Sequence, residues 1–137
     1  MEYILYRETG YKYDLPYPYY RITSIKPEEI IVLGKIKLLK NGLLHLDTGF
    51  SWDCPSGPMI DTTNLIRASA EHDAFYRLIR WEKLDQRFQR KVDIEFIKVA
   101  KKDGVNVFRR WYALRGLKKF GYTAISKESR LKVLRAP

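Results

Sequence analysis

The chain has 137 residues, of which 45% are hydrophobic, 14% aromatic and 31% charged. This length fits one domain, 1–137, and the composition excludes disorder, collagen-like repeats and coiled coils. No apolar run approaches the roughly 20 residues of a membrane span, and the acidic start (Glu2, Glu8) differs from the basic start of a signal peptide. The single cysteine, Cys54, cannot form an internal disulfide. We expect a soluble cytoplasmic domain with no export signal.

The net charge of +10 comes entirely from the second half of the chain. Residues 1–60 contain seven Lys/Arg and seven Asp/Glu, whereas residues 61–137 contain nineteen and nine. A positive field of this size favours an anionic partner such as nucleic acid or an acidic lipid surface. The alternative is a basic surface that only keeps the protein in solution.

Strand and turn signals dominate the first 48 residues. The N-terminal residues are rich in Tyr, Ile and Leu, and two prolines within 15–19 allow only a loop or an edge strand there. Short β-prone runs follow at 30–33 and 35–39. Asn41-Gly42, which lies between two pairs of leucines, is the strongest hairpin signal in the chain. These features predict a small antiparallel sheet.

Helical signals follow in the second half. Segment 49–60 combines Gly, Pro, Ser and Asp with two large aromatics, which predicts an ordered loop. Capping side chains at 61–64 precede a helical stretch from Leu65 to about Trp81. Two more helices are expected, from about Phe88 to Asp103 and from about Val107 to Phe120, each ending at a glycine. The expected class is α+β, a small N-terminal antiparallel sheet followed by three helices, in four parts: a β-rich part (1–48), an ordered loop (49–60), a helical part (61–121) and a basic tail (122–137).

One face of the first expected helix carries a histidine among core positions. At about 100° per residue that face comprises Leu65, Ser69, His72, Tyr76 and Ile79. A histidine on such a face is more often a hydrogen-bonded core residue than a catalyst. In the next helix, however, Asp93 shares a face with apolar residues, and a buried carboxylate needs a partner. If the two helices pack antiparallel, Asp93 can accept the imidazole N–H of His72 and leave the other ring nitrogen as an acceptor.

This histidine and carboxylate are the minimal part of a general-base site. The imidazole of His72 can take a proton from water or a hydroxyl, and Asp93 can orient it and stabilise the imidazolium. No Gly-x-Ser-x-Gly motif accompanies the serines, and Cys54 has no identifiable activating base. Water is therefore the expected nucleophile.

A calcium site is a further candidate. Asp73, next to His72, together with Asp53, Asp61 and carbonyls of the Gly- and Pro-rich loop, offers the oxygen ligands that calcium accepts. Turn and capping chemistry is the alternative explanation for Asp53 and for Asp61.

The third expected helix carries a basic surface beside aromatics. Its cationic residues are Arg109, Arg110, Arg115, Lys118 and Lys119, with Trp111 and Tyr112 close by. Such a surface suits an anionic phospholipid membrane, and it also suits nucleic acid, whose bases stack on aromatic rings. The alternative is that the aromatics belong to the core and the charges are solvated.

An ordered series of residues resembles a family of small bacteriophage and prophage proteins of uncharacterised function. The series covers about residues 49–121 and comprises Gly49-Phe50-x-x-Asp53-x-x-Ser56-x-Pro58, Ile60-Asp61-Thr62, His72-Asp73-x-x-Tyr76, Asp93-x-x-Phe96, Trp111-Tyr112-Ala113-Leu114-Arg115 and Phe120-Gly121. The resemblance implies a phage origin, and hence location in the host cytoplasm or the virion, but by itself no activity.

A narrower part of the series is similar to the core of the phospholipase A2 superfamily, especially its short viral and bacterial members. There, His-Asp-x-x-Tyr lies on one helix and a second Asp, about twenty residues on, lies on an antiparallel partner. The resemblance implies that His72 is the general base, Asp93 its orienting partner, Tyr76 a support and Asp73 a ligand of calcium. The secreted enzymes also have a Gly-rich, Cys-containing calcium loop and disulfides, which this chain lacks.

Three hypotheses of function follow. The first is a phage-encoded, phospholipase A2-like hydrolase that cleaves a lipid ester at a membrane. The second is a non-catalytic phage protein with a role in the virion or in contact with a host protein, which keeps His72 and Asp93 as a buried polar network. The third, a nucleic-acid-binding accessory, depends on charge alone. Exposure of the histidine to water distinguishes the first two.

Overall fold

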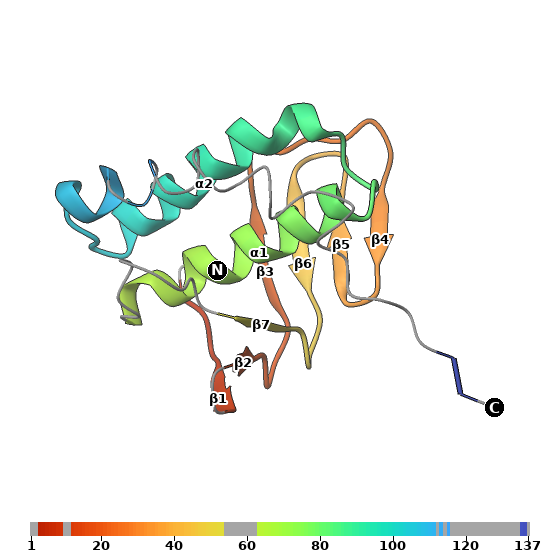
Figure 1. Cartoon of the computed structure of the whole chain (residues 1–137), viewed down its shortest axis with the longest axis horizontal. Helices are drawn as coiled ribbons and strands as arrows, with labels where there is room; N and C mark the ends of the chain where they lie inside the picture. The colour runs from red at the N-terminus through yellow and green to blue at the C-terminus, as the bar shows by residue number, and fades with distance from the viewer. Residues whose placement is uncertain are drawn as a thin grey trace.

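The structure, a computed structural model, describes residues 3–9, 12–53, 63–111, 113, 115 and 135–136. It has the α+β class expected from the sequence, with the strands preceding the helices (Figure 1). Residues 107–111, 113 and 115 are helical too. The described elements are β1 (Arg7–Thr9), β2 (Lys12–Asp14), β3 (Tyr19–Ile22), β4 (Ile31–Leu33), β5 (Ile36–Leu38), β6 (Leu43–Leu46), β7 (Ser51–Asp53), the 3-10 turn η1 (Thr63–Leu65), α1 (Ile66–Arg80), the 3-10 turn η2 (Gln86–Phe88) and α2 (Gln89–Lys102).

The described strands form two antiparallel sheets. The four-stranded sheet has the order β3-β6-β5-β4, and the three-stranded sheet has the order β1-β2-β7. The second sheet corrects the expectation of a loop over 49–60, because Ser51–Asp53 pairs with β2. Trp52 explains this strand, since its ring is buried and packs against Phe50 and Tyr13. Residues 54–60, 61–62 and most of the expected basic tail lie outside the described residues.

The hairpin predicted at Asn41-Gly42 is confirmed and joins β5 to β6. Leu38 pairs with Leu44 in the ladder, and the side chain of Asn41 accepts a hydrogen bond from the backbone N–H of Leu43. Gly42 has φ +92°, and a Cβ there would lie 2.1 Å from the carbonyl oxygen of Thr23. The turn therefore requires glycine both for its backbone conformation and for the close approach of Thr23, the residue that follows β3.

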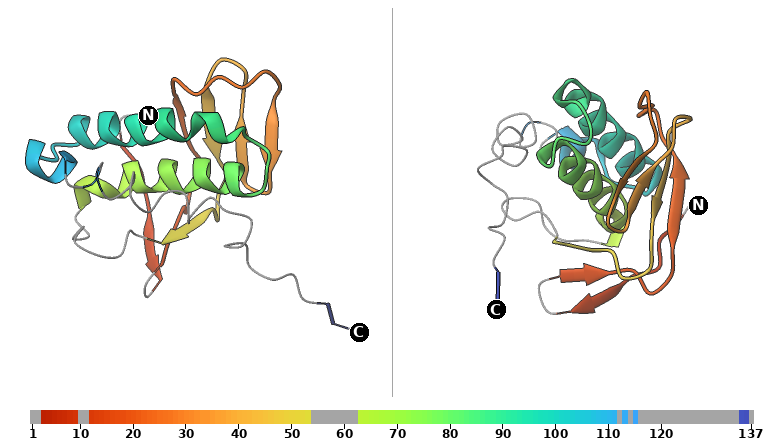
Figure 2. Two further views of the ribbon diagram at one scale, coloured as in Figure 1. Left: turned by 45° about the horizontal axis from the view of Figure 1, so that its top comes forward. Right: turned by 90° about the vertical axis from the view of Figure 1, so that its right-hand side faces the viewer.

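Helices α1 and α2 are antiparallel and lie side by side over one face of the four-stranded sheet (Figures 1 and 2). Their bounds agree with the stretches expected from about Leu65 to Trp81 and from about Phe88 to Asp103. Gly104, at φ +88°, follows α2 as the sequence predicts. None of the described helices is long and apolar enough to cross a bilayer.

The core between the helices and the four-stranded sheet is mainly apolar. Leu38, Leu44 and Leu46 from the sheet form one buried cluster with Phe75 and Leu78 of α1. A second, smaller cluster joins the start of α1 and the end of α2 to the helical residues that follow; its buried members are Leu65, Ala68, Phe96, Val99, Ala100, Val105 and Ala113. The α1–α2 pair is thus held at fixed spacing, which positions the side chains between the two helices.

Candidate active site

The His72–Asp93 contact expected between the two helices is present. The Nε2 atom of His72 lies 2.8 Å from Oδ1 of Asp93, and the hydroxyl of Tyr76 donates to the same oxygen at 2.6 Å. His72 and Tyr76 come from one face of α1 and Asp93 from the facing side of α2, as the helical periodicity predicts. Asp93 and Tyr76 are buried, whereas the His72 side chain is 12% exposed.

This geometry decides which ring nitrogen carries the proton. A carboxylate oxygen only accepts hydrogen bonds, so Nε2 of neutral His72 is the N–H that donates to Asp93. The other nitrogen, Nδ1, then has a free lone pair, and it has no hydrogen-bond partner among the described residues. An oriented imidazole with an available lone pair is the arrangement of a general base.

Aromatic rings fix the imidazole in this position. The ring centroid of Tyr76 lies 4.0 Å from that of His72, and Phe96 meets the imidazole edge-on at 5.4 Å. Burial, together with the Asp93 carboxylate, raises the pKa of Tyr76 well above its usual value, so the phenol stays protonated and remains a donor. The Tyr76 hydroxyl therefore donates to Asp93 throughout the pH range in which histidines ordinarily titrate.

Asp73, expected as a calcium ligand, is ion-paired with an arginine. Oδ2 of Asp73 lies 2.6 Å from Nη2 of Arg77, one helical turn further along α1. The same guanidinium donates to the carbonyl oxygen of Ser51 and lies over the ring of Phe50, with 4.8 Å between its Cζ and the ring centroid. Burial raises the pKa of Asp73, and the positive charges of Arg77 and Arg80 oppose that rise. A cationic side chain thus neutralises the carboxylate that the resemblance assigns to a metal.

The other two expected calcium ligands do not join Asp73 in a described site. Asp53 is the exposed last residue of β7, and Asp61 lies outside the described residues. Within the part of the chain that is described, no three His, Cys, Asp or Glu side chains gather as a metal site. Among the described residues, Asp73 is a poor ligand for calcium, because its carboxylate already has a cationic partner.

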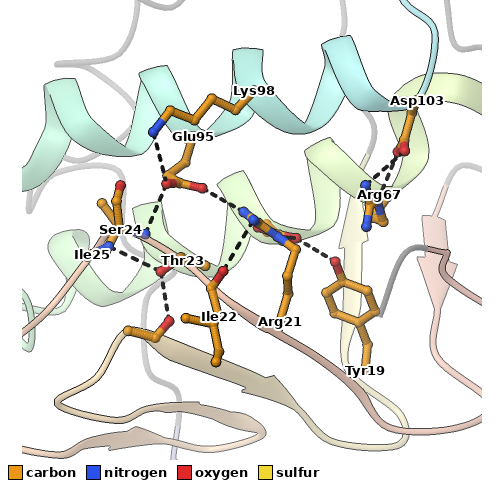
Figure 3. Close-up of polar contacts among 12 residues, drawn as sticks. Tyr19, Arg21, Ile22, Thr23, Ser24, Ile25, Arg67, Glu95, Lys98 and Asp103 are labelled. Atoms are coloured by element: carbon orange, nitrogen blue, oxygen red, sulfur yellow. Dashed lines mark hydrogen bonds and ion pairs between the residues drawn. The ribbon is translucent and has the colours of Figure 1, made fainter.

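A buried ionic network, absent from the sequence expectations, lies close to the His72 site. Arg21 on β3 donates to both oxygens of Glu71 on α1, at 2.8 Å each, and to Oε2 of Glu95 on α2 at 2.6 Å. Tyr19 donates to Glu71 at 2.5 Å, and the backbone N–H of Ser24 donates to Glu95 at 2.9 Å. Figure 3 shows the Arg21 side chain extending from the strand toward Glu95. One arginine therefore ties the sheet to both helices.

A second buried ion pair joins the start of α1 to the end of α2. The guanidinium of Arg67, only 2% exposed, donates to both oxygens of Asp103 at 3.0 and 2.9 Å (Figure 3). Sequence signals for these pairs do exist. Arg67 and Glu71 stand four residues apart on an α1 face that continues with Ala74 and Phe75, and a charge on an apolar face predicts a buried partner.

The expected basic surface is only partly described. Arg109 and Arg110 are half-buried and Arg115 is exposed, while Lys118 and Lys119 lie outside the described residues. The helical residues there expose large apolar side chains as well, with Phe108 80% exposed.

Comparisons with known proteins gave no match to a family model, to a curated protein or to a solved structure. The two resemblances noted in the sequence therefore stay hypotheses.

Proposed function

We propose that this protein is a phospholipase A2-like hydrolase, encoded by a phage, in which His72 activates water to cleave a lipid ester. The observation that carries the proposal is the asymmetry of the imidazole. Nε2 is held at 2.8 Å by the buried Asp93, and Nδ1 has no hydrogen-bond partner among the described residues. Among the described residues, Nδ1 is not one of the buried atoms that lack a partner, so a water molecule can reach it and form the hydrogen bond from which general-base catalysis starts.

The proposed step begins with a water molecule hydrogen-bonded to Nδ1 of His72. As the water oxygen attacks the ester carbonyl carbon, its proton moves to Nδ1, and Asp93 stabilises the imidazolium that forms. The tetrahedral intermediate then collapses, the bond to the alcohol oxygen breaks, and Nδ1–H returns the proton to that oxygen. The products are a fatty acid and the alcohol. No metal takes part in these steps, because Asp73 is paired with Arg77.

A second candidate function is a non-catalytic role in the phage virion or in contact with a host protein. Burial favours it: Asp93 and Tyr76 are sealed between the helices, and only 12% of the His72 side chain is exposed. In that case the three side chains stabilise the α1–α2 pair and do nothing else.

His72→Gln separates the two candidates. The Gln side chain places its amide N–H close to the position of Nε2, so it can still donate to Asp93, but it cannot accept a proton from water. The measurement is release of fatty acid from anionic phospholipid vesicles, together with hydrolysis of a soluble short-chain ester. Loss of both activities with an unchanged melting temperature is the expected result. If the wild type releases no acid from either substrate, the non-catalytic role is correct.

The same hydrolysis assay, repeated with calcium and with a chelator, tests whether a metal is needed. Because Arg77 already neutralises Asp73, hydrolysis is expected to proceed equally with added calcium and with a chelator. Activity that is abolished by the chelator and restored by calcium would show that a metal enters the site, and would overturn the metal-free form of the mechanism.

A further inference from the structure

The helical residues after α2 turn their large apolar side chains toward solvent. Val107 is 59% exposed, Phe108 80% and Trp111 54%. Asn106 begins this helix: its side-chain oxygen accepts from the backbone N–H of Arg109, and its carbonyl accepts from that of Arg110. The N-cap fixes where the helix starts and therefore which side chains point outward.

The exposed residues lie on one side of that helix. At about 100° per residue, Val107, Phe108, Trp111 and Arg115 fall within roughly a third of the circumference. Ala113 lies on the opposite side and is buried against the cluster that contains Leu65 and Phe96. We call the four outward residues the aromatic face. Among the described residues of this helix the large apolar side chains face outward, the reverse of an ordinary surface helix, which turns them inward.

The aromatic face includes a positive charge and belongs to a basic part of the sequence. The guanidinium of Arg115 lies over the Trp111 ring, with 4.9 Å between its Cζ and the ring centroid. Lys101 and Lys102, at the end of α2, are exposed as well. Between Asp103 and Glu128 the sequence contains six Lys/Arg and no acidic residue. The segment that displays the apolar side chains thus also lacks acidic residues.

We propose that the aromatic face is a docking surface for an anionic phospholipid bilayer, which rests on the proposed action on lipid esters. A bilayer offers acyl chains to Val107 and Phe108, the interfacial region to Trp111 and phosphate groups to Arg115. Nucleic acid offers phosphates and bases for stacking, but nothing comparable for an exposed valine. The positive charge of the face and its exposed aliphatic side chain therefore favour lipid.

The test is cosedimentation of the full chain with vesicles of phosphatidylglycerol and phosphatidylcholine. The double variant Phe108→Ala/Trp111→Ala is expected to bind at least about tenfold more weakly, because two large apolar side chains no longer enter the interface. Ile22→Ala/Val32→Ala is the matched control, since both residues are apolar and more than half exposed but lie on the four-stranded sheet. The control is expected to bind as the wild type does.

Charge is tested separately. Arg115→Gln is expected to weaken binding to anionic vesicles about fivefold, with little change for pure phosphatidylcholine. Equal loss in the double variant and its control would overturn the proposal. So would binding of wild type to a DNA duplex or to single-stranded RNA without binding to vesicles, because nucleic acid would then be the partner.

Two further measurements separate this proposal from the proposed hydrolase. His72→Gln is expected to bind vesicles like the wild type, because docking does not use the imidazole. Phe108→Ala/Trp111→Ala is expected to cleave the soluble short-chain ester at the wild-type rate. Vesicle binding without any ester cleavage would contradict the proposed hydrolase and support the docking surface. Cleavage of the soluble ester without vesicle binding would support the hydrolase and contradict the docking surface.

Discussion

Arg21 of β3 donates from Nη2 to Oε2 of Glu95 on α2 at 2.6 Å, across 74 positions of the sequence. The same guanidinium also holds both oxygens of Glu71 on α1. The contact brings two buried carboxylates, from two different helices, to one strand residue. A single positive charge therefore joins the sheet to both helices, in addition to the apolar core between them.

Removal of that charge is expected to be strongly destabilising. Arg21→Met keeps most of the side-chain volume but leaves two buried carboxylates without their main partner, which costs about 3–5 kcal/mol. Urea unfolding followed by circular dichroism measures the loss. Lys37→Met on β5 is the control, since its side chain is exposed and its removal is expected to leave the midpoint unchanged. A loss below about 1 kcal/mol for Arg21→Met would show that the network does not hold the layers together.

Stability is expected to fall in acid because of Glu95. Burial acts to raise the pKa of Glu95, but hydrogen bonds from Ser24 and Arg21 outweigh it, so the pKa lies below the ordinary value of 4.5. A carboxyl whose pKa is lowered by folding stabilises the fold above its unfolded pKa, and that contribution is lost as the pH falls through the folded value. Urea midpoints measured from about pH 6 to pH 3 should therefore decrease, with a shallower slope for Glu95→Gln. Equal slopes for the two proteins would contradict this assignment.

Asp93→Asn tests how the orienting carboxylate acts. The amide can donate to Nε2 of His72 and to the Tyr76 oxygen, which places the imidazole proton on Nδ1 and removes the base. Ester hydrolysis is expected to fall by about three to four orders of magnitude, as in other sites that lose the correct tautomer. Nitrogen NMR of the imidazole reports the tautomer directly. A variant that keeps full activity, with the proton still on Nε2, would show that Asp93 is not needed for orientation.

Gly42→Ala is expected to lower the stability of the fold more than Gly104→Ala does. Both glycines have φ near +90°, so alanine at either position is strained by about 1–2 kcal/mol. A Cβ at residue 42 would in addition lie 2.1 Å from the Thr23 carbonyl oxygen, whereas residue 104 has no neighbour within 4 Å. Thermal unfolding of the two variants gives the difference. If both variants lose the same free energy of unfolding, the backbone around Thr23 moves away from the turn at no cost in stability.

The predictable parts of the fold depend on local pattern. Asn41-Gly42 predicts its hairpin because the turn needs a positive φ between two β-prone runs. Gly104 predicts the end of α2 for a similar reason. His72 and Asp93 can be paired because each is a polar group on an otherwise apolar face, and their helices follow one another in the chain. In each case the prediction uses only residues that lie close together in the sequence.

Other features depend on contacts that no local pattern specifies. Ser51–Asp53 was expected to be loop, but β2 supplies its ladder hydrogen bonds and the core buries Trp52. Val107 and Trp111 have the spacing of core residues, yet the smaller Ala113 takes the inward side of their helix. Propensity could not decide either case, because the outcome depends on which face of an element meets the rest of the molecule.

The sequence by itself determined the α+β class, the order of strands before helices, the hairpin and the polar pair His72–Asp93. Only the tertiary structure decided that Asp73 pairs with Arg77, that Arg21 joins two buried glutamates, and that the aromatic face points outward. The physical reason is the range of the forces involved. Backbone conformation and periodicity are set within a few residues, whereas the partner of a charge is set by burial, which brings distant residues together and makes an unpaired charge too costly.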